Sequence, residues 1–67
     1  MTPEQAYRLA KKIYGQRPEH LRLGQWAFSC LYYTLPELAN EIRGNDILDP
    51  FYVDSRMAAF EEYIFQA

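Results

Sequence analysis

The segment LRLGQWAFSCLYYTLPELANEIRG, residues 21–44, contains the most strongly apolar helix pattern of the chain. Apolar side chains recur in it every three to four residues, the spacing of one helix face. This stripe consists of Leu21, Gly24, Phe28, Leu31 and Leu35, widened by Ala27 and Tyr32. QWAFSCLYY is apolar on nearly every side, which indicates a helix central in its fold or partly buried in a partner. We predict that this helix covers residues 18–33.

Gly24 lies on this apolar stripe, away from any predicted turn. A glycine inside a helix is about 1 kcal/mol less favourable than an alanine. The simplest role for it is to let a second backbone come close. We therefore expect the tightest packing of the fold at Gly24.

Two further helices are predicted on the C-terminal side. Pro36 ends the helix over residues 18–33 and begins another over residues 36–43. Gly44 ends this second helix. Asp54 is the predicted N-cap of a last helix over residues 54–65. The apolar stripe of the helix over residues 36–43 is Leu35, Leu38, Ala39 and Ile42. That of the last helix is Val53, Met57, Phe60 and Ile64.

On the N-terminal side, Thr2 and Gln5 form the pattern of a capping box. The predicted helix covers residues 3–14. Its apolar stripe is Ala6, Leu9, Ala10 and Ile13. This stripe places Lys11 and Lys12 on the solvated side. With no repeat and no strand alternation, residues 1–67 form a single all-α domain, a compact bundle of four short helices.

The chain has a net charge of −2, but its two halves differ in sign. Residues 1–33 hold five basic and two acidic side chains, whereas residues 34–67 hold two basic and seven acidic ones. The halves can attract each other within the fold, or the acidic half can face a basic partner.

The composition favours a reducing compartment. Cys30 is the only cysteine, so no internal disulfide can form, although small secreted domains normally need several. No apolar run resembles a signal peptide or reaches the length of a membrane span. We expect a cytoplasmic protein without membrane contact.

No catalytic, cofactor or metal motif is present, and we expect no enzymatic activity. His20 and Cys30 are ten positions apart on the predicted helix, about 15 Å of rise, too far for a nucleophile and its base. Asp46, Asp49 and Asp54 lack the alternating oxygen ligands and central glycine of a calcium loop. Cys30 is expected to be a packed side chain.

The connector RGNDILDPFYVDSR, residues 43–56, has two interpretations. As a structural link, its aspartates cap helix starts and interact with Arg43 and Arg56, while Phe51 is buried and Tyr52 lies nearer the surface. As a recognition element, it offers Tyr52 and Asp46 to a partner. The sequence leaves both open.

Three motifs, RLGQWAF, LPELANEIRG and DPFYVDSR, are together similar to a group of short, uncharacterised helical proteins encoded by bacteriophages and prophages. The similarity spans about residues 3–65. It carries over no activity. It implies a phage-type accessory protein that acts in the host cytoplasm by binding a host or phage protein.

Our first hypothesis is therefore a helical interaction module. Its predicted partner-binding residues are Trp26, Asp46, Asp49, Tyr52, Arg56, Glu61, Glu62 and Tyr63. The second hypothesis is weak nucleic-acid association through the basic residues Arg8, Lys11, Lys12, Arg17 and Arg22. Seven acidic side chains in the other half oppose phosphate binding, so nucleic acid is the less favoured partner. A homodimer is compatible with either hypothesis.

Overall fold

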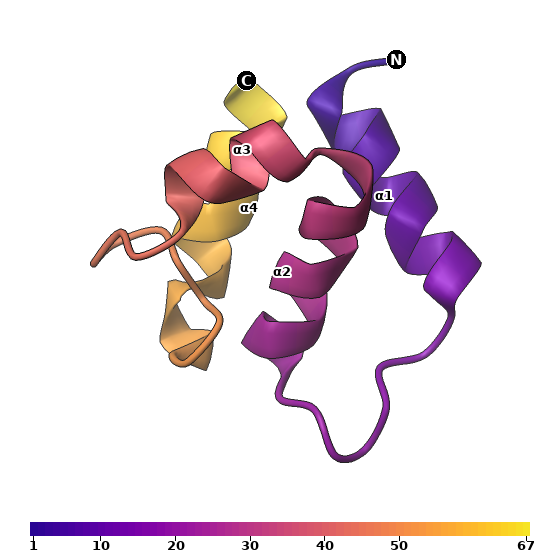
Figure 1. The fold of residues 1–67 in the computed structure, drawn as a ribbon, viewed down its shortest axis with the longest axis vertical. Helices are drawn as coiled ribbons and strands as arrows, with labels where there is room; N and C mark the ends of the chain where they lie inside the picture. Colours follow the sequence, from indigo (N-terminus) through magenta and orange to yellow (C-terminus); the bar gives the residue numbers. More distant parts are fainter.

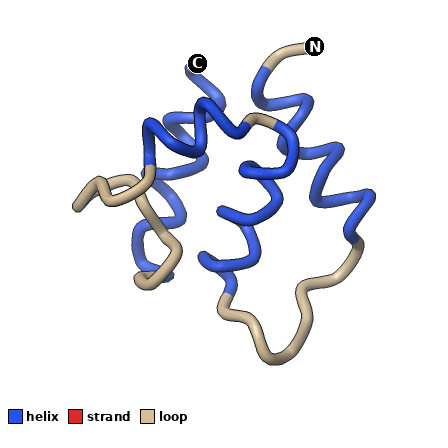
Figure 2. The backbone as a smooth tube through the Cα atoms, viewed as in Figure 1, coloured by secondary structure: helices blue, strands red, loops and turns tan.

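The structure is a computed structural model that describes residues 1–67 as four α-helices without a strand (Figures 1 and 2). The helices are α1 (Pro3–Tyr14), α2 (Leu23–Thr34), α3 (Pro36–Ile42) and α4 (Met57–Gln66). A single 3-10 turn, η1 (Asp54–Arg56), precedes α4. The predicted all-α class and its four helices are confirmed.

Helix α2 lies at the centre of the fold, as predicted. It packs against α1, α3 and η1, and α1 also packs against α4. In Figure 1, α1 runs beside α2, and α3 crosses near the C-terminal end of α2. The shared core contains Tyr7, Ala27, Phe28, Leu31, Ala39, Ile42, Phe60 and Ile64.

The start of α2 differs from the prediction. The helix begins at Leu23 rather than near Pro18. Residues 18–21 form a separate turn, in which the Leu21 N–H donates to the Pro18 carbonyl at 3.1 Å. The Arg17 guanidinium also donates to the Leu21 carbonyl. These two hydrogen bonds close residues 18–21 into a turn of their own, and the helix begins after it.

The prediction that Asp54 caps the last helix is wrong. Its carboxylate accepts a hydrogen bond from the Gly24 N–H at 3.0 Å and so caps the first turn of α2. The start of α2 is therefore set by a residue thirty positions further along the chain.

The buried face of α1 also differs from the predicted stripe. Leu9 and Ile13 lie at the surface, and Ile13 is 68% exposed. Tyr7 and Ala10 are fully buried instead. The edge of the Tyr7 ring meets Phe60 of α4, with the ring centroids 5.8 Å apart. Because α1 contacts both α2 and α4, a large ring between them stabilises the fold more than two smaller aliphatic side chains.

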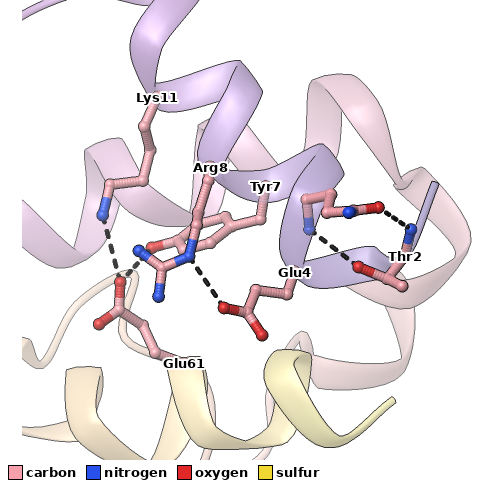
Figure 3. A network of polar contacts seen from close by, with 7 residues as sticks. Thr2, Glu4, Tyr7, Arg8, Lys11 and Glu61 are labelled. Atoms are coloured by element: carbon pink, nitrogen blue, oxygen red, sulfur yellow. Dashed lines mark hydrogen bonds and ion pairs between the residues drawn. The ribbon is translucent and has the colours of Figure 1, made fainter.

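The expected solvated position of Lys11 is wrong for the same reason. Figure 3 shows Tyr7 and Lys11 reaching Glu61 of α4 together. The Tyr7 hydroxyl donates to the Glu61 carboxylate at 2.8 Å, and Lys11 Nζ lies 3.3 Å from the same oxygen. The figure also shows the Thr2 capping box, which is confirmed.

Candidate functional site

The connector between α3 and α4 is held by hydrogen bonds to its own side chains. The Asp49 carboxylate is only 8% exposed and accepts from the Gly44 N–H at 2.7 Å and the Phe51 N–H at 2.9 Å. Asn45 Oδ1 accepts from the Ile47 and Leu48 N–H groups at 2.8 and 2.9 Å. These bonds fix the backbone on which Phe51 and Tyr52 stand.

The connector also docks tightly on α2. A Cβ added at Gly24 would overlap the Pro50 carbonyl oxygen, so the close backbone approach predicted there is confirmed. The Arg22 guanidinium donates to the Phe51 carbonyl and lies 3.9 Å from Asp54. Arg56 donates to the backbone carbonyl of Asp49 at 3.2 Å. Arg56 thus interacts with an aspartate as predicted, but with the backbone carbonyl of Asp49 rather than with its carboxylate.

Arg43 does not pair with an aspartate, contrary to the prediction. Its guanidinium carbon lies 5.4 Å from the centroid of the Tyr32 ring and 5.7 Å from that of Phe28. Contacts of this kind stabilise a cation through the negative face of the ring. The side chain is exposed and forms neither a hydrogen bond nor an ion pair within the chain. Its donors therefore stay free for water or for a partner.

Arg43 is part of a connected row of rings, which we call the aromatic belt. Its members, in order of contact from one to the next, are Tyr14, Tyr33, Tyr32, Arg43, Phe28, Phe51 and Tyr52. Neighbouring ring centroids are between 4.8 Å and 6.4 Å apart. Arg22 extends the row beyond Tyr52, with its guanidinium carbon 5.8 Å from that ring.

The belt combines exposed tyrosine rings with two phenylalanine rings that reach into the core. Its four tyrosines are exposed, from 42% for Tyr32 to 79% for Tyr52. Phe28 is buried and Phe51 is partly buried, so they join the exposed members to the core. Side chains on a helix tilt toward its N-terminus. Tyr14, at the end of α1, and Tyr33, near the end of α2, tilt in this way and meet between the two helices.

Three hollows lie along the belt. One of about 260 Å³ is lined by Phe28, Arg43, Asp49, Phe51 and Tyr52. A smaller one of about 170 Å³ is lined by Phe28, Ser29, Tyr32, Tyr33, Arg43 and Phe51. A third, of about 260 Å³, is lined by Tyr14, Pro18, Leu21, Trp26, Ser29, Cys30 and Tyr33. The first two share Phe28, Arg43 and Phe51 in their linings, so Arg43 borders both hollows.

The structure separates the predicted partner-binding residues into several places. Tyr52 is in the belt, and Trp26 lines the hollow beside its Tyr14 end. Asp46 is exposed on the connector, and Glu62 and Tyr63 are exposed on α4. Four of the eight form hydrogen bonds within the chain: Asp49 with backbone N–H groups, Arg56 with a carbonyl, Glu61 with Tyr7 and Lys11, and Glu62 with Gln66.

Several belt residues were not predicted from the sequence. Tyr14, Tyr33 and Arg43 were not among the predicted contacts, although one signal was present. Tyr32 and Tyr33 are adjacent on one helix, about 100° apart, so they cannot both point into the same core. The spacing therefore predicts that at least one of the two is exposed, whereas the approach of Tyr14 and Arg43 depends on the tertiary fold.

The reactive side chains have structural surroundings. Cys30 is only 2% exposed, and burial raises the pKa of its thiol, which Lys11 partly offsets. This confirms the expected packed cysteine. His20 is exposed in the turn before α2. No group of three or more His, Cys, Asp or Glu side chains is arranged to hold a metal ion, and no helix has the length and apolar character to cross a bilayer.

No family model, curated protein or solved structure matches the chain. The geometry and chemistry of the belt are therefore the basis for assigning its function.

Proposed function

We propose that this chain is a non-enzymatic protein-binding module that docks through the aromatic belt. The observation that supports this proposal is the row of four exposed tyrosines and Arg43 across α1, α2 and the connector, in which Phe28 and Phe51 link Arg43 to Tyr52. Tyrosine and arginine are enriched among the residues that dominate binding energy at protein interfaces. Exposed apolar side chains are ordinary when scattered, but a connected patch indicates an interaction site.

The rigidity of the belt favours binding as well. A tyrosine has two rotatable side-chain bonds and loses little conformational entropy when it is immobilised. Here each ring already rests on another ring or on an arginine. We further propose that the partner is a host or phage protein in the host cytoplasm, which is what the resemblance of RLGQWAF, LPELANEIRG and DPFYVDSR to phage-encoded proteins implies.

Nucleic acid is the weaker candidate because most of the proposed basic zone is paired. Arg8 lies 3.0 Å from Glu4, Lys11 lies 3.3 Å from Glu61, and Arg22 lies near Asp54. Only Lys12 and Arg17 of that zone have no ion pair. Phosphate-backbone binding draws its strength from several contacts that release counterions.

A capture experiment with matched tyrosine variants tests the proposal. The tagged chain is mixed with bacterial host lysate, with and without nuclease, and the captured protein is purified and bound again as a single component. We expect nuclease-resistant capture that Tyr33→Ala or Tyr52→Ala weakens at least about tenfold, as for interface anchors. Tyr63→Ala is the control, because Tyr63 is also exposed but makes no ring contact with the belt.

Two results would contradict the proposal. Capture that nuclease abolishes would assign the chain to nucleic acid. Capture that both belt variants retain, while Tyr63→Ala loses it, would move the docking surface to α4.

A further inference from the structure

We propose that the partner presents an acidic segment, in which a carboxylate pairs with Arg43 and a neighbouring apolar side chain enters the hollow beside it. This inference rests on the proposed protein-binding function and specifies the chemistry that the belt recognises. It is carried by two observations: Arg43 lines two hollows of the belt, and its charge has no ion pair within the chain.

The Arg43 side chain is held in place before any partner arrives. Its backbone N–H donates to the Ala39 carbonyl at 2.9 Å, and its φ and ψ of −54° and 128° direct the chain away from α3. The guanidinium then rests near two rings, Tyr32 and Phe28. A guanidinium fixed in this way keeps its planar fork of donors, which matches the two oxygens of a carboxylate. The two ring contacts restrict the side chain, so binding costs less side-chain entropy than it would for an arginine without such contacts.

No carboxylate in the chain neutralises Arg43. The acidic side chain nearest to it along the hollow is Asp49, which already accepts from Gly44 and Phe51. The chain forms three ion pairs, and none of them includes Arg43. The positive charge at this point of the belt is therefore complementary to an incoming carboxylate.

The hollow and the guanidinium select different groups. Phe28, Phe51 and Tyr52 give the hollow of about 260 Å³ apolar walls. Asp49, also in its lining, disfavours an anion inside it. An incoming carboxylate therefore stays outside at Arg43, while an apolar or aromatic neighbour fills the hollow. The recognised segment combines one acidic and one large apolar side chain.

A protein segment fits this arrangement better than a polyphosphate. Arg43 is the belt's own cation, and Arg22 beyond Tyr52 is already engaged with Phe51 and Asp54. One free guanidinium falls short of the several phosphate contacts that nucleic-acid binding needs. The net charge of −2 opposes a polyanion more strongly than a segment with one or two carboxylates.

Peptide titration followed by backbone amide NMR tests the inference. The probe is the blocked peptide acetyl-Glu-Trp-Glu-Leu-amide, and the matched probe carries glutamine at both glutamate positions. We expect the acidic peptide to shift the amides of Phe28, Arg43 and Phe51. Replacing its glutamates, or introducing Arg43→Gln, should raise the dissociation constant roughly tenfold, as for loss of a charged hydrogen-bonded pair.

Two further variants separate charge from geometry. Arg43→Lys keeps the charge but loses the fork, so it should bind less tightly than the parent and more tightly than Arg43→Gln. Lys12→Gln removes an exposed cation of α1 that forms no ion pair, and it should bind like the parent. Melting temperatures of all variants confirm that they are folded.

Four results would overturn the inference. They are equal binding of the glutamine peptide, unchanged binding by Arg43→Gln, tighter binding of a short oligothymidylate at the same amides, and shifts at these amides that depend on protein concentration alone. The last would make a second copy of the chain the occupant. If lysate capture depends on Tyr33 and Tyr52 but not on Arg43, this inference fails while the proposed function stands.

Discussion

At the scale of single residues, Gly24 shows how a local cost supports a tertiary contact. The missing side chain lets the Pro50 carbonyl approach α2, and the Gly24 N–H binds the Asp54 carboxylate. Gly24 therefore makes both contacts that join α2 to the connector at this point, one with Pro50 and one with Asp54. The sequence indicated the close approach, because a glycine on an apolar stripe has no other simple role. It could not identify Pro50 and Asp54, which are distant in the chain.

Gly24→Ala tests this contact. The added Cβ overlaps the Pro50 carbonyl, so the connector or α2 must shift, at about 1–3 kcal/mol as for overpacking. Higher helix propensity offsets about 1 kcal/mol of that cost. We expect thermal denaturation to give a lower melting temperature than the parent. Asn40→Ala, an exposed substitution on α3, is the control and should change the stability little. A Gly24→Ala variant that melts above the parent would disprove the contact.

Tyr7 gives a second prediction at this scale, on pH. Burial, followed by the hydrogen bond and the charge of Glu61, raises the Tyr7 pKa well above the ordinary 10.0. A raised pKa in the folded state means that the fold favours the protonated phenol. That contribution to stability is complete below the ordinary pKa and is lost as pH rises above it.

Denaturant unfolding of parent and Tyr7→Phe between neutral and alkaline pH measures this contribution. The free energy of unfolding of the parent should fall more steeply above about pH 10 than that of Tyr7→Phe. Parallel pH profiles would show that the Tyr7 hydroxyl is not held in the way its contact with Glu61 indicates.

At the scale of elements, the connector combines the two roles that the sequence left open. Asn45 and Asp49 bind its backbone, and Pro50 docks on α2, so these positions are structural. Tyr52 is exposed at the end of the aromatic belt, so it is available to a partner. The helices themselves were predictable from apolar spacing and from Pro and Gly positions. The start of α2 and the inward face of α1 were not, since Asp54 and α4 determine them from a distance.

A pair of connector variants separates these roles. Phe51 is partly buried and its ring meets Phe28 at 5.7 Å, so Phe51→Ala should cost about 2–3 kcal/mol, below the range for a fully buried ring. Tyr52→Ala removes an exposed ring and should change the stability by less than about 0.5 kcal/mol. Chemical denaturation of both variants measures the difference. If Tyr52→Ala were the more destabilising change, the assignment of the two positions would be reversed.

At the scale of the whole molecule, the two oppositely charged halves attract each other. Two of the three ion pairs, Lys11 with Glu61 and Arg22 with Asp54, join the basic half to the acidic half. The charge asymmetry of the sequence is thus partly used inside the fold. The aromatic belt lies at the surface and is assembled from three segments distant in the chain. No local pattern could have revealed that assembly.

The six tyrosines allow one measurement of the central claim, that the belt is the docking surface. Hydroxyl-radical footprinting compares the oxidation of each tyrosine in the free chain and in the complex with the captured partner. Tyr7 is buried and should react little in either state, and exposed Tyr63 should react equally in both. Our account predicts that the partner protects Tyr14, Tyr32, Tyr33 and Tyr52 together. Protection of Tyr63 with all four belt tyrosines left reactive would contradict it.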